Sequence, residues 1–210
     1  MEHGKRFAGW RRRLSLREQY LVDQVVGRIV PDFNRNGFVW YPNSGGGSPS
    51  RVGANVIPLQ RRGEKNWPVV EIYFLSGGGP RFKINFSVLP EICRSIEGVE
   101  ILREHAAAQY GPAYFGLRRG IWGDYLDSEF GFDWASLLLP SPAKMLQLIR
   151  YLINWRRFLD SEVDAALLLL PVLYEIFDHG ISQDWLEHDF GKITPNVMLI
   201  HSWKLWGGKA

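Results

Sequence analysis

The sequence has few of the residues that disulfides, metal centres and membrane anchors require. Cys93 is the only cysteine, which excludes an intrachain disulfide and a multi-cysteine zinc site and is typical of the reducing cytosol. The longest apolar run, Ala165–Tyr174, is far shorter than the roughly 20 residues that span a bilayer. The basic stretch Met1–Arg13 lacks the apolar segment of a secretory signal. We therefore expect a cytoplasmic protein without a membrane contact.

Catalytic motifs are also missing. None of the five histidines has the paired spacing of a helical zinc site. Asp184 and His188, four residues apart, could share a metal ion, but such a pair is more often a solvated helix face. The Asp…Glu-x-Lys pattern of nucleases is absent, because Glu71 is followed by Ile72 and Tyr73, and no serine-hydrolase elbow occurs. We expect no catalytic residue, metal ligand or cofactor.

Two β-rich runs around a glycine-rich turn form the centre of the expected fold. Trp67–Leu75 and Arg81–Val88 flank the turn, and apolar and polar side chains alternate in the second run, as in a strand with one buried face. The turn glycines tolerate positive φ, and Pro80 restarts the extended chain. A phosphate-binding loop would lead into a helix, whereas a strand follows Gly77–Gly79. We therefore predict a long hairpin with a glycine tip.

Strands gather in the first half of the chain and helices in the second. Further strands are expected at Phe38–Tyr41, Ala54–Leu59 and Ala113–Leu117. Helices are expected at 15–30 (opened by a capping box of Ser15 and Glu18 and closed by Pro31), 89–97, 99–110, 141–159, 160–179 (capped by Asp160 and Ser161 and bent at Pro171) and 182–190. The apolar residues of the helix at 141–159, Ile149 and Ile153 among them, should point inward. This order predicts an α+β fold, in which an N-terminal helix and C-terminal helices pack against an antiparallel sheet built around the central hairpin. We expect a basic N-terminal arm at residues 1–14 and a single domain over 15–206.

The strand segments carry a resemblance to a known family. An opening helix is followed, in this order, by Gly37-Phe38 at a strand start, Val56–Gln60 and Phe82–Val88. This arrangement, over roughly residues 15–120, resembles the bacterial family known as domain of unknown function 4304. The resemblance implies an α+β domain in a bacterial cytosolic protein and carries over no functional residue.

The net charge of +3 conceals a strong asymmetry along the chain. Residues 1–30 have seven basic and three acidic side chains, and residues 31–120 have eleven and seven. Residues 121–190 have four basic and twelve acidic side chains, a balance of −8. Either the two halves complement each other within one domain, which is the simpler interpretation, or each presents a charged face to a partner.

An acidic and aromatic loop is the most distinctive polar cluster. Its candidate binding residues are Trp122, Asp124, Tyr125, Asp127, Glu129 and Asp133. They could hold a hard cation, although the spacing of an EF-hand is absent, they could form a recognition surface, or the loop could simply be held by its aromatic residues. Our leading hypothesis is a non-enzymatic protein-binding module of immunity or antitoxin type, whose partner is another protein such as a basic toxin or nuclease.

A second hypothesis is nucleic-acid binding through basic residues. The candidates are Arg11, Arg12, Arg13, Arg61 and Arg62, with Phe7 and Trp10 beside the first three. No second basic and aromatic cluster stands beside the N-terminal one in the sequence, and a frayed terminus is the simpler interpretation of residues 1–14. A metal-dependent hydrolase is the third alternative.

Overall fold

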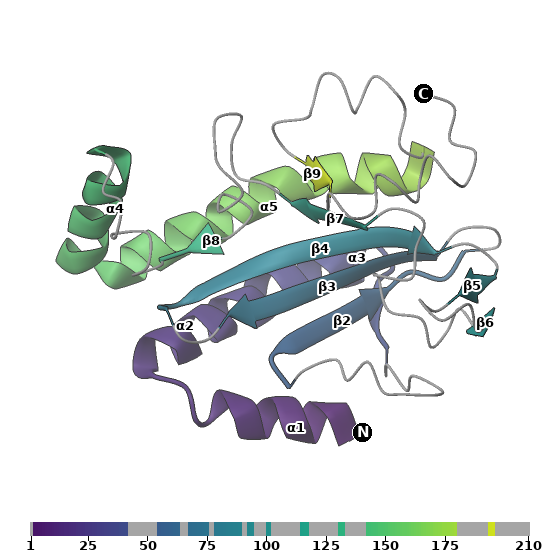
Figure 1. Ribbon diagram of the computed structural model, residues 1–210, viewed down its shortest axis with the longest axis horizontal. Helices are drawn as coiled ribbons and strands as arrows, with labels where there is room; N and C mark the ends of the chain where they lie inside the picture. The colour runs from purple at the N-terminus through teal and green to yellow at the C-terminus, as the bar shows by residue number, and fades with distance from the viewer. Residues whose placement is uncertain are drawn as a thin grey trace.

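The computed structural model describes residues 2–41, 54–63, 67–75, 78–89, 92–94, 100–101, 114–117, 130–132, 142–179 and 193–195 (Figure 1). Its helical elements are α1 (Glu2–Arg11), α2 (Leu16–Gln24), the π-helix η1 (Val25–Ile29), α3 (Val30–Arg35), α4 (Pro142–Ile153) and α5 (Trp155–His179). Its strands are β1 (Val39–Trp40), β2 (Val56–Gln60), β3 (Trp67–Leu75), β4 (Arg81–Leu89), β5 (Cys93–Arg94), β6 (Glu100–Ile101), β7 (Tyr114–Leu117), β8 (Phe130–Gly131) and β9 (Ile193–Pro195).

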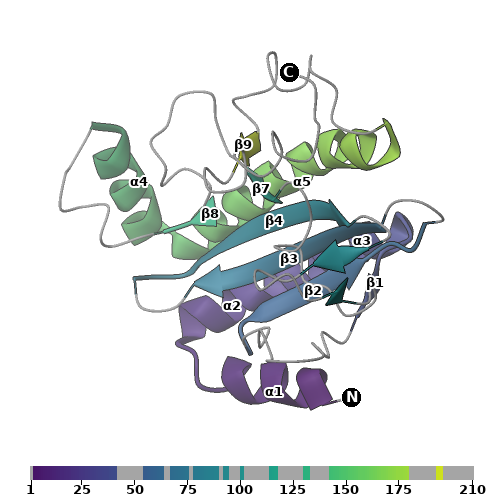
Figure 2. The ribbon, with the colours of Figure 1, turned by 45° about the vertical axis from the view of Figure 1, so that its right-hand side comes forward.

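A seven-stranded antiparallel sheet confirms the predicted α+β fold. The strand order is β1-β2-β3-β4-β7-β9, and β8 pairs with another part of β4. The apolar face of the sheet, which includes Ile57, Ile72 and Ile84, forms one core with side chains of α2, η1 and α5. Helices from both ends of the chain therefore cover this face (Figures 1 and 2).

The central hairpin of β3 and β4 is confirmed along its whole length. The pairing runs without a bulge from Trp67 opposite Leu89 to Leu75 opposite Arg81. At the tip, Gly79 has a φ of +118°, a conformation that glycine adopts readily. Phe82, Ile84 and Phe86 lie on one buried face, as the alternation predicts, but Asn85 and Ser87 on the other face are buried as well.

The N-terminal helix runs further than predicted. Ser15 opens it with the expected capping box, since its side chain accepts from the Glu18 backbone N–H and Glu18 accepts from the Ser15 backbone N–H. The prediction that Pro31 ends the helix is wrong, because α3 continues to Arg35. A proline lacks the N–H that bonds four residues back, and its ring presses on that carbonyl. The wider turn of η1, in which the Val30 N–H bonds the Val25 carbonyl, shifts the hydrogen-bond ladder just before this point.

The basic N-terminal segment is helical and packs on the sheet rather than fraying. Phe7 of α1 is buried, and its ring lies 6.1 Å from that of Phe74. The Trp10 ring lies 5.7 Å from that of Phe74, and Arg11 donates two hydrogen bonds to Asp23. Two aromatic anchors and a bidentate ion pair therefore hold α1 to the hairpin and α2.

The segment after the hairpin is a second correction. Instead of a helix at 89–97, β4 runs to Leu89, and Cys93–Arg94 pairs with Glu100–Ile101 in a small antiparallel ladder. The predicted helix at 99–110 is therefore wrong at its start, and its remainder lies outside the described residues, as does the helix predicted at 182–190. The strand β7 confirms the prediction at 113–117, and β9, which pairs with β7, was not predicted.

The boundary between the two long helices lies earlier than predicted. α4 ends at Ile153, and the Asn154 side chain accepts a hydrogen bond of 3.1 Å from the Arg157 backbone N–H, as an N-cap residue does. Asp160 and Ser161, the predicted cap, lie inside α5, which continues through Pro171. No helix within the described residues is long and apolar enough to cross a membrane.

Candidate functional site

The helix α4 turns its apolar stripe away from the protein. Five large apolar side chains are exposed: Met145 (44%), Leu146 (49%), Ile149 (49%), Leu152 (60%) and Ile153 (79%). Their spacing places them on one side of a helix with about 100° per residue. The prediction that the apolar residues of this helix point inward is therefore wrong for Met145, Ile149, Leu152 and Ile153, whereas Leu148 packs partly against the core. We call the five exposed residues the α4 apolar face.

The opposite side of α4 holds the helix in place. Tyr151 is buried and stacks on Phe132 with ring centroids 4.1 Å apart, and its ring meets the edge of Phe158 at 5.7 Å. Leu148, three residues earlier, packs partly against the same core. α4 then projects beyond the end of the sheet (Figures 1 and 2). The contacts of Tyr151 fix the orientation of α4 about its own axis. The α4 apolar face, on the other side of the helix, therefore points to solvent.

Arginine and aromatic side chains interleave where α2 meets the start of α5. The Arg17 guanidinium lies 5.1 Å from the Tyr151 ring and 5.8 Å from the Trp155 ring, and it donates to the Tyr151 hydroxyl at 3.1 Å. Arg156 lies 5.2 Å from the Trp155 ring and 5.7 Å from that of Tyr20. The Tyr20 and Trp155 rings meet edge to face at 5.2 Å. We call Arg17, Tyr20, Tyr151, Trp155 and Arg156 the arginine–aromatic patch.

Two ion pairs join the two halves of the chain. Arg28 pairs with Asp164, and Arg61 pairs with Asp178 at 2.5 Å. Each joins an arginine from the basic N-terminal half to a carboxylate of α5. The simpler interpretation of the charge asymmetry, that the halves complement each other, thus has direct support.

The structure separates the five arginines that we predicted for nucleic acid. Arg11 is paired with Asp23, and Arg61 is paired with Asp178 near the C-terminal end of α5 and lies over the Phe38 ring. Arg62 lies 5.6 Å from the Trp67 ring. Arg12 and Arg13 are exposed and precede α2, whose Arg17 contacts the other end of α5. At a rise of about 1.5 Å per residue, the two ends of α5 are about 35 Å apart, so the predicted residues do not form one site.

All six predicted binding residues of the acidic and aromatic loop, Trp122, Asp124, Tyr125, Asp127, Glu129 and Asp133, lie outside the described residues, as do Asp184 and His188. Within the described residues, no three His, Cys, Asp or Glu side chains come together to hold a metal ion.

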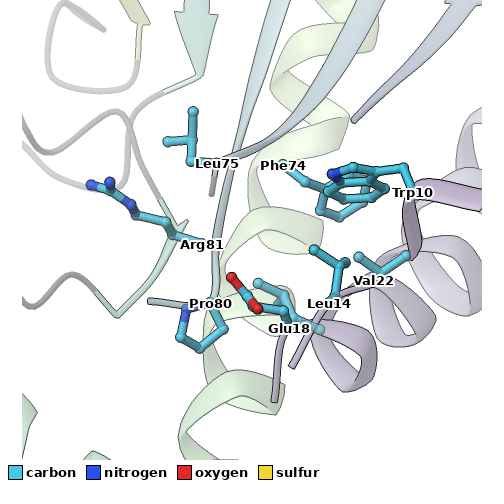
Figure 3. Close-up of a pocket in the computed structure, with 9 residues that line it drawn as sticks. Trp10, Leu14, Glu18, Val22, Phe74, Leu75, Pro80 and Arg81 are labelled. Carbon is cyan, nitrogen blue, oxygen red and sulfur yellow. The ribbon is translucent and has the colours of Figure 1, made fainter. Parts of the chain in front are cut away.

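A small hollow lies between the α1–α2 turn and the tip of the hairpin (Figure 3). Trp10, Leu14, Val22 and Phe74 line it, and Glu18 and Arg81 are its charged members. Its volume of about 10 Å³ is the space of a single water molecule. This hollow is therefore too small for a metabolite.

The second face of the sheet buries a row of polar side chains. Gln60, Glu71, Asn85 and Ser87 are all less than a tenth exposed. Glu71 lies opposite Asn85 across the hairpin, and its carboxylate accepts a hydrogen bond of 2.6 Å from the Tyr73 hydroxyl. This hydrogen bond satisfies one oxygen of the buried Glu71 carboxylate within the sheet.

A partly buried tyrosine links α5 to α3 and makes the free energy of unfolding sensitive to alkaline pH. The Tyr174 hydroxyl donates to Asp32 at 2.7 Å. Burial raises the pKa of Tyr174 above its usual value, and the hydrogen bond to Asp32 and the negative charge of that residue raise it further. The pKa is thus higher in the folded state, so the stabilisation is complete below the unfolded pKa of about 10 and is lost as the pH rises above it.

We expect Tyr174→Phe to lower the free energy of unfolding by about 1 kcal/mol at neutral pH, because it removes this hydrogen bond. The gap between the two proteins should narrow as the pH rises past about 10. Urea unfolding of both proteins at neutral and alkaline pH measures this. A gap that stays constant over the whole range would show that the Tyr174 hydroxyl does not control the alkaline loss.

The sequence contains one signal for the arginine–aromatic patch, because the tripeptide Trp-Arg-Arg occurs at Trp10–Arg12 and again at Trp155–Arg157. Only the fold reveals that Trp155 and Arg17, 138 positions apart, are neighbours. The α4 apolar face has a helical period that we recognised, but the direction it faces depends on contacts distant in the sequence.

Comparison with known proteins adds no relative. No protein-family model matches this chain, and searches of curated proteins and of solved structures find no match either. The resemblance to domain of unknown function 4304 therefore stays a prediction.

Proposed function

We propose that this chain is a non-enzymatic protein-binding module that uses the α4 apolar face to dock on a partner protein. The observation that carries the proposal is the set of five exposed apolar side chains on one side of one helix. Monomeric proteins rarely leave a large contiguous apolar surface in water, and such surfaces commonly mark interaction sites.

The spacing of the α4 apolar face supports docking into a groove. Met145, Ile149 and Leu152 stand at positions i, i+4 and i+7, and Leu146, Ile149 and Ile153 stand at i, i+3 and i+7. Amphipathic helices present anchors at these intervals when they lie in the hydrophobic groove of a partner. Full burial of one such side chain contributes about 1.5–3 kcal/mol, so a few anchors suffice for a stable complex. The partner therefore needs an apolar groove about three helical turns long.

A finer version of the proposal is a role of immunity or antitoxin type. It rests on the acidic segment at residues 121–190, which would suit a basic toxin or nuclease. Asp160, Asp164 and Asp178 of this segment already bind Tyr20, Arg28 and Arg61 within the protein. The finer version therefore depends on the loop at 122–134, with Asp124, Asp127 and Glu129.

Capture of partners from the native host tests the proposal. Ile149→Asp together with Ile153→Asp should reduce partner capture at least about tenfold, because each carboxylate would have to be buried without a counter-ion. Leu168→Asp is the matched control, since Leu168 is a 78% exposed leucine on α5 outside the α4 apolar face. This variant should capture the partner as the unchanged protein does.

The same capture experiment distinguishes binding by the α4 apolar face from binding by the acidic loop. If Asp124→Ala, Asp127→Ala and Glu129→Ala abolish capture while the α4 double variant retains it, the acidic loop and not α4 is the binding face. If the α4 double variant and the Leu168→Asp control capture a specific partner equally well, the proposal for α4 fails. Circular dichroism verifies that each variant is folded.

A further inference from the structure

Several arginines in the arginine–aromatic patch, or next to it along the chain, have no carboxylate partner. None of them forms an ion pair within the described part of the protein. They are Arg12, Arg13, Arg17, Arg150, Arg156 and Arg157. Of the other described arginines, 11, 28, 35 and 61 each pair with an aspartate, whereas Arg6 and Arg62 do not. Asp160, next to the patch, accepts from the Tyr20 hydroxyl at 2.8 Å. Most of the described arginines without an ion pair therefore lie in the arginine–aromatic patch or near it along the chain.

Two of these arginines, Arg17 and Arg156, contact aromatic rings. The five N–H donors of a guanidinium lie in its plane, so contact of its flat face with a ring leaves them available. Arg156 lies 5.2 Å from the Trp155 ring and 5.7 Å from the Tyr20 ring, and Arg17 gives one donor to the Tyr151 hydroxyl. The patch thus offers fixed, forked donors of the kind that bind phosphate.

We propose that the arginine–aromatic patch binds the phosphate backbone of a single-stranded nucleic acid. The inference is independent of the α4 apolar face, because it rests on different side chains. Basic residues interleaved with aromatic rings are the usual combination in single-strand binding, in which arginines contact phosphates while rings and guanidinium planes stack on bases. Trp155 and Tyr20 are only partly buried, so their outer edges and the stacked Arg156 can meet a base. An acidic polypeptide would use the charges but not the rings, which is why the observations favour a nucleic acid.

The salt dependence of binding measures the number of phosphates in contact. Fluorescence anisotropy with a labelled oligo(dT) or oligo(U) of about 12 nucleotides gives the affinity. If Arg17, Arg150, Arg156 and Arg157 each bind one phosphate, affinity should fall about 50-fold between about 50 and about 200 mM NaCl. Arg156→Gln with Arg157→Gln should bind more weakly at low salt and lose only about 7-fold over the same range.

A matched control removes the same charge at the other end of α5. Arg35 pairs with Asp32, whose side chain also binds Tyr174, and Arg62 lies beyond β2 near Trp67. Arg35→Gln with Arg62→Gln should keep the affinity and the salt dependence of the unchanged protein. If this control weakens binding as much as Arg156→Gln with Arg157→Gln does, attraction is diffuse and the proposed site is wrong.

Two further ligands test the chemistry. The proposal requires that a duplex of the same length and a polyglutamate of the same charge bind more weakly than the single strand, and that Trp155→Leu reduces this preference. Equal binding of polyglutamate would assign the surface to acidic proteins instead. No measurable binding of the single strand at low salt would overturn the proposal.

Discussion

Gly131→Ala should lower the free energy of unfolding by about 4 kcal/mol, the sum of backbone strain and overpacking. Gly131 has a φ of +118°, and a Cβ there would lie 2.3 Å from the Pro80 carbonyl oxygen and 2.7 Å from the Arg81 Cα. These neighbours are backbone atoms of the central hairpin, so they cannot move aside as a side chain would. The Gly131 N–H also bonds the buried Glu162 carboxylate of α5 at 3.1 Å, which fixes the glycine from the other side.

Gly27→Ala is the control for this substitution. Gly27 lies in η1 with no atom within 4 Å of an added Cβ, and alanine in a helix is favoured over glycine by about 0.5–1 kcal/mol. We therefore expect Gly27→Ala to stabilise the protein slightly. Urea unfolding of both variants measures the two effects, and a loss of under about 1 kcal/mol for Gly131→Ala would contradict the close approach of β8 and the hairpin tip.

Phe82→Ala should cost about 3–5 kcal/mol, the usual range for truncation of a buried phenylalanine. Phe82 is fully buried on the central strand β4. Its ring stacks on Phe130 of β8 with centroids 5.2 Å apart and lies 6.5 Å from the Phe74 ring. One truncation thus leaves a cavity between the hairpin and β8.

Leu168→Ala provides the comparison for Phe82→Ala, because Leu168 is 78% exposed. Its effect should stay within about 0.5 kcal/mol, as for other surface substitutions. Thermal or urea unfolding gives both values. If the two variants were equally stable, Phe82 could not occupy the core position assigned to it.

The parts of the fold that the sequence predicted well depend on local patterns. The alternation in residues 81–88 is enough to define a strand with two faces, and the glycine turn sets the register with residues 67–75. The capping box at Ser15 likewise involves residues only three apart. These features need no knowledge of the rest of the chain.

One error is local, because Pro31 ordinarily ends a helix but η1 shifts the hydrogen-bond ladder before it. The other errors arise where a contact with another segment decides. Residues 93–94 form a strand because residues 100–101 pair with them. For α4, the helical period showed that an apolar stripe exists but not which way it faces, and the contact of Tyr151 with Phe132 decides that direction.

The candidate surfaces were less predictable than the fold for the same reason. Composition revealed the basic and acidic halves of the chain, but the pairing of Arg28 with Asp164 shows which charges are used internally only after folding. The arginines around Trp155 that form no ion pair can be identified only when these internal ion pairs are known. A binding surface consists of side chains that make no contact inside the protein, so contacts between residues distant in the sequence determine which side chains form it.

The central claim is that the α4 apolar face docks on a partner protein. Photo-crosslinking in the native host tests this claim most directly. A benzoylphenylalanine at position 149 or 153 should crosslink to one and the same partner, because both positions lie on the α4 apolar face. The same group at position 168 on α5, where Leu168 is 78% exposed and Ile153 is 79% exposed, should give no such product. Crosslinks that are absent at 149 and 153, or identical at all three positions, would contradict the account.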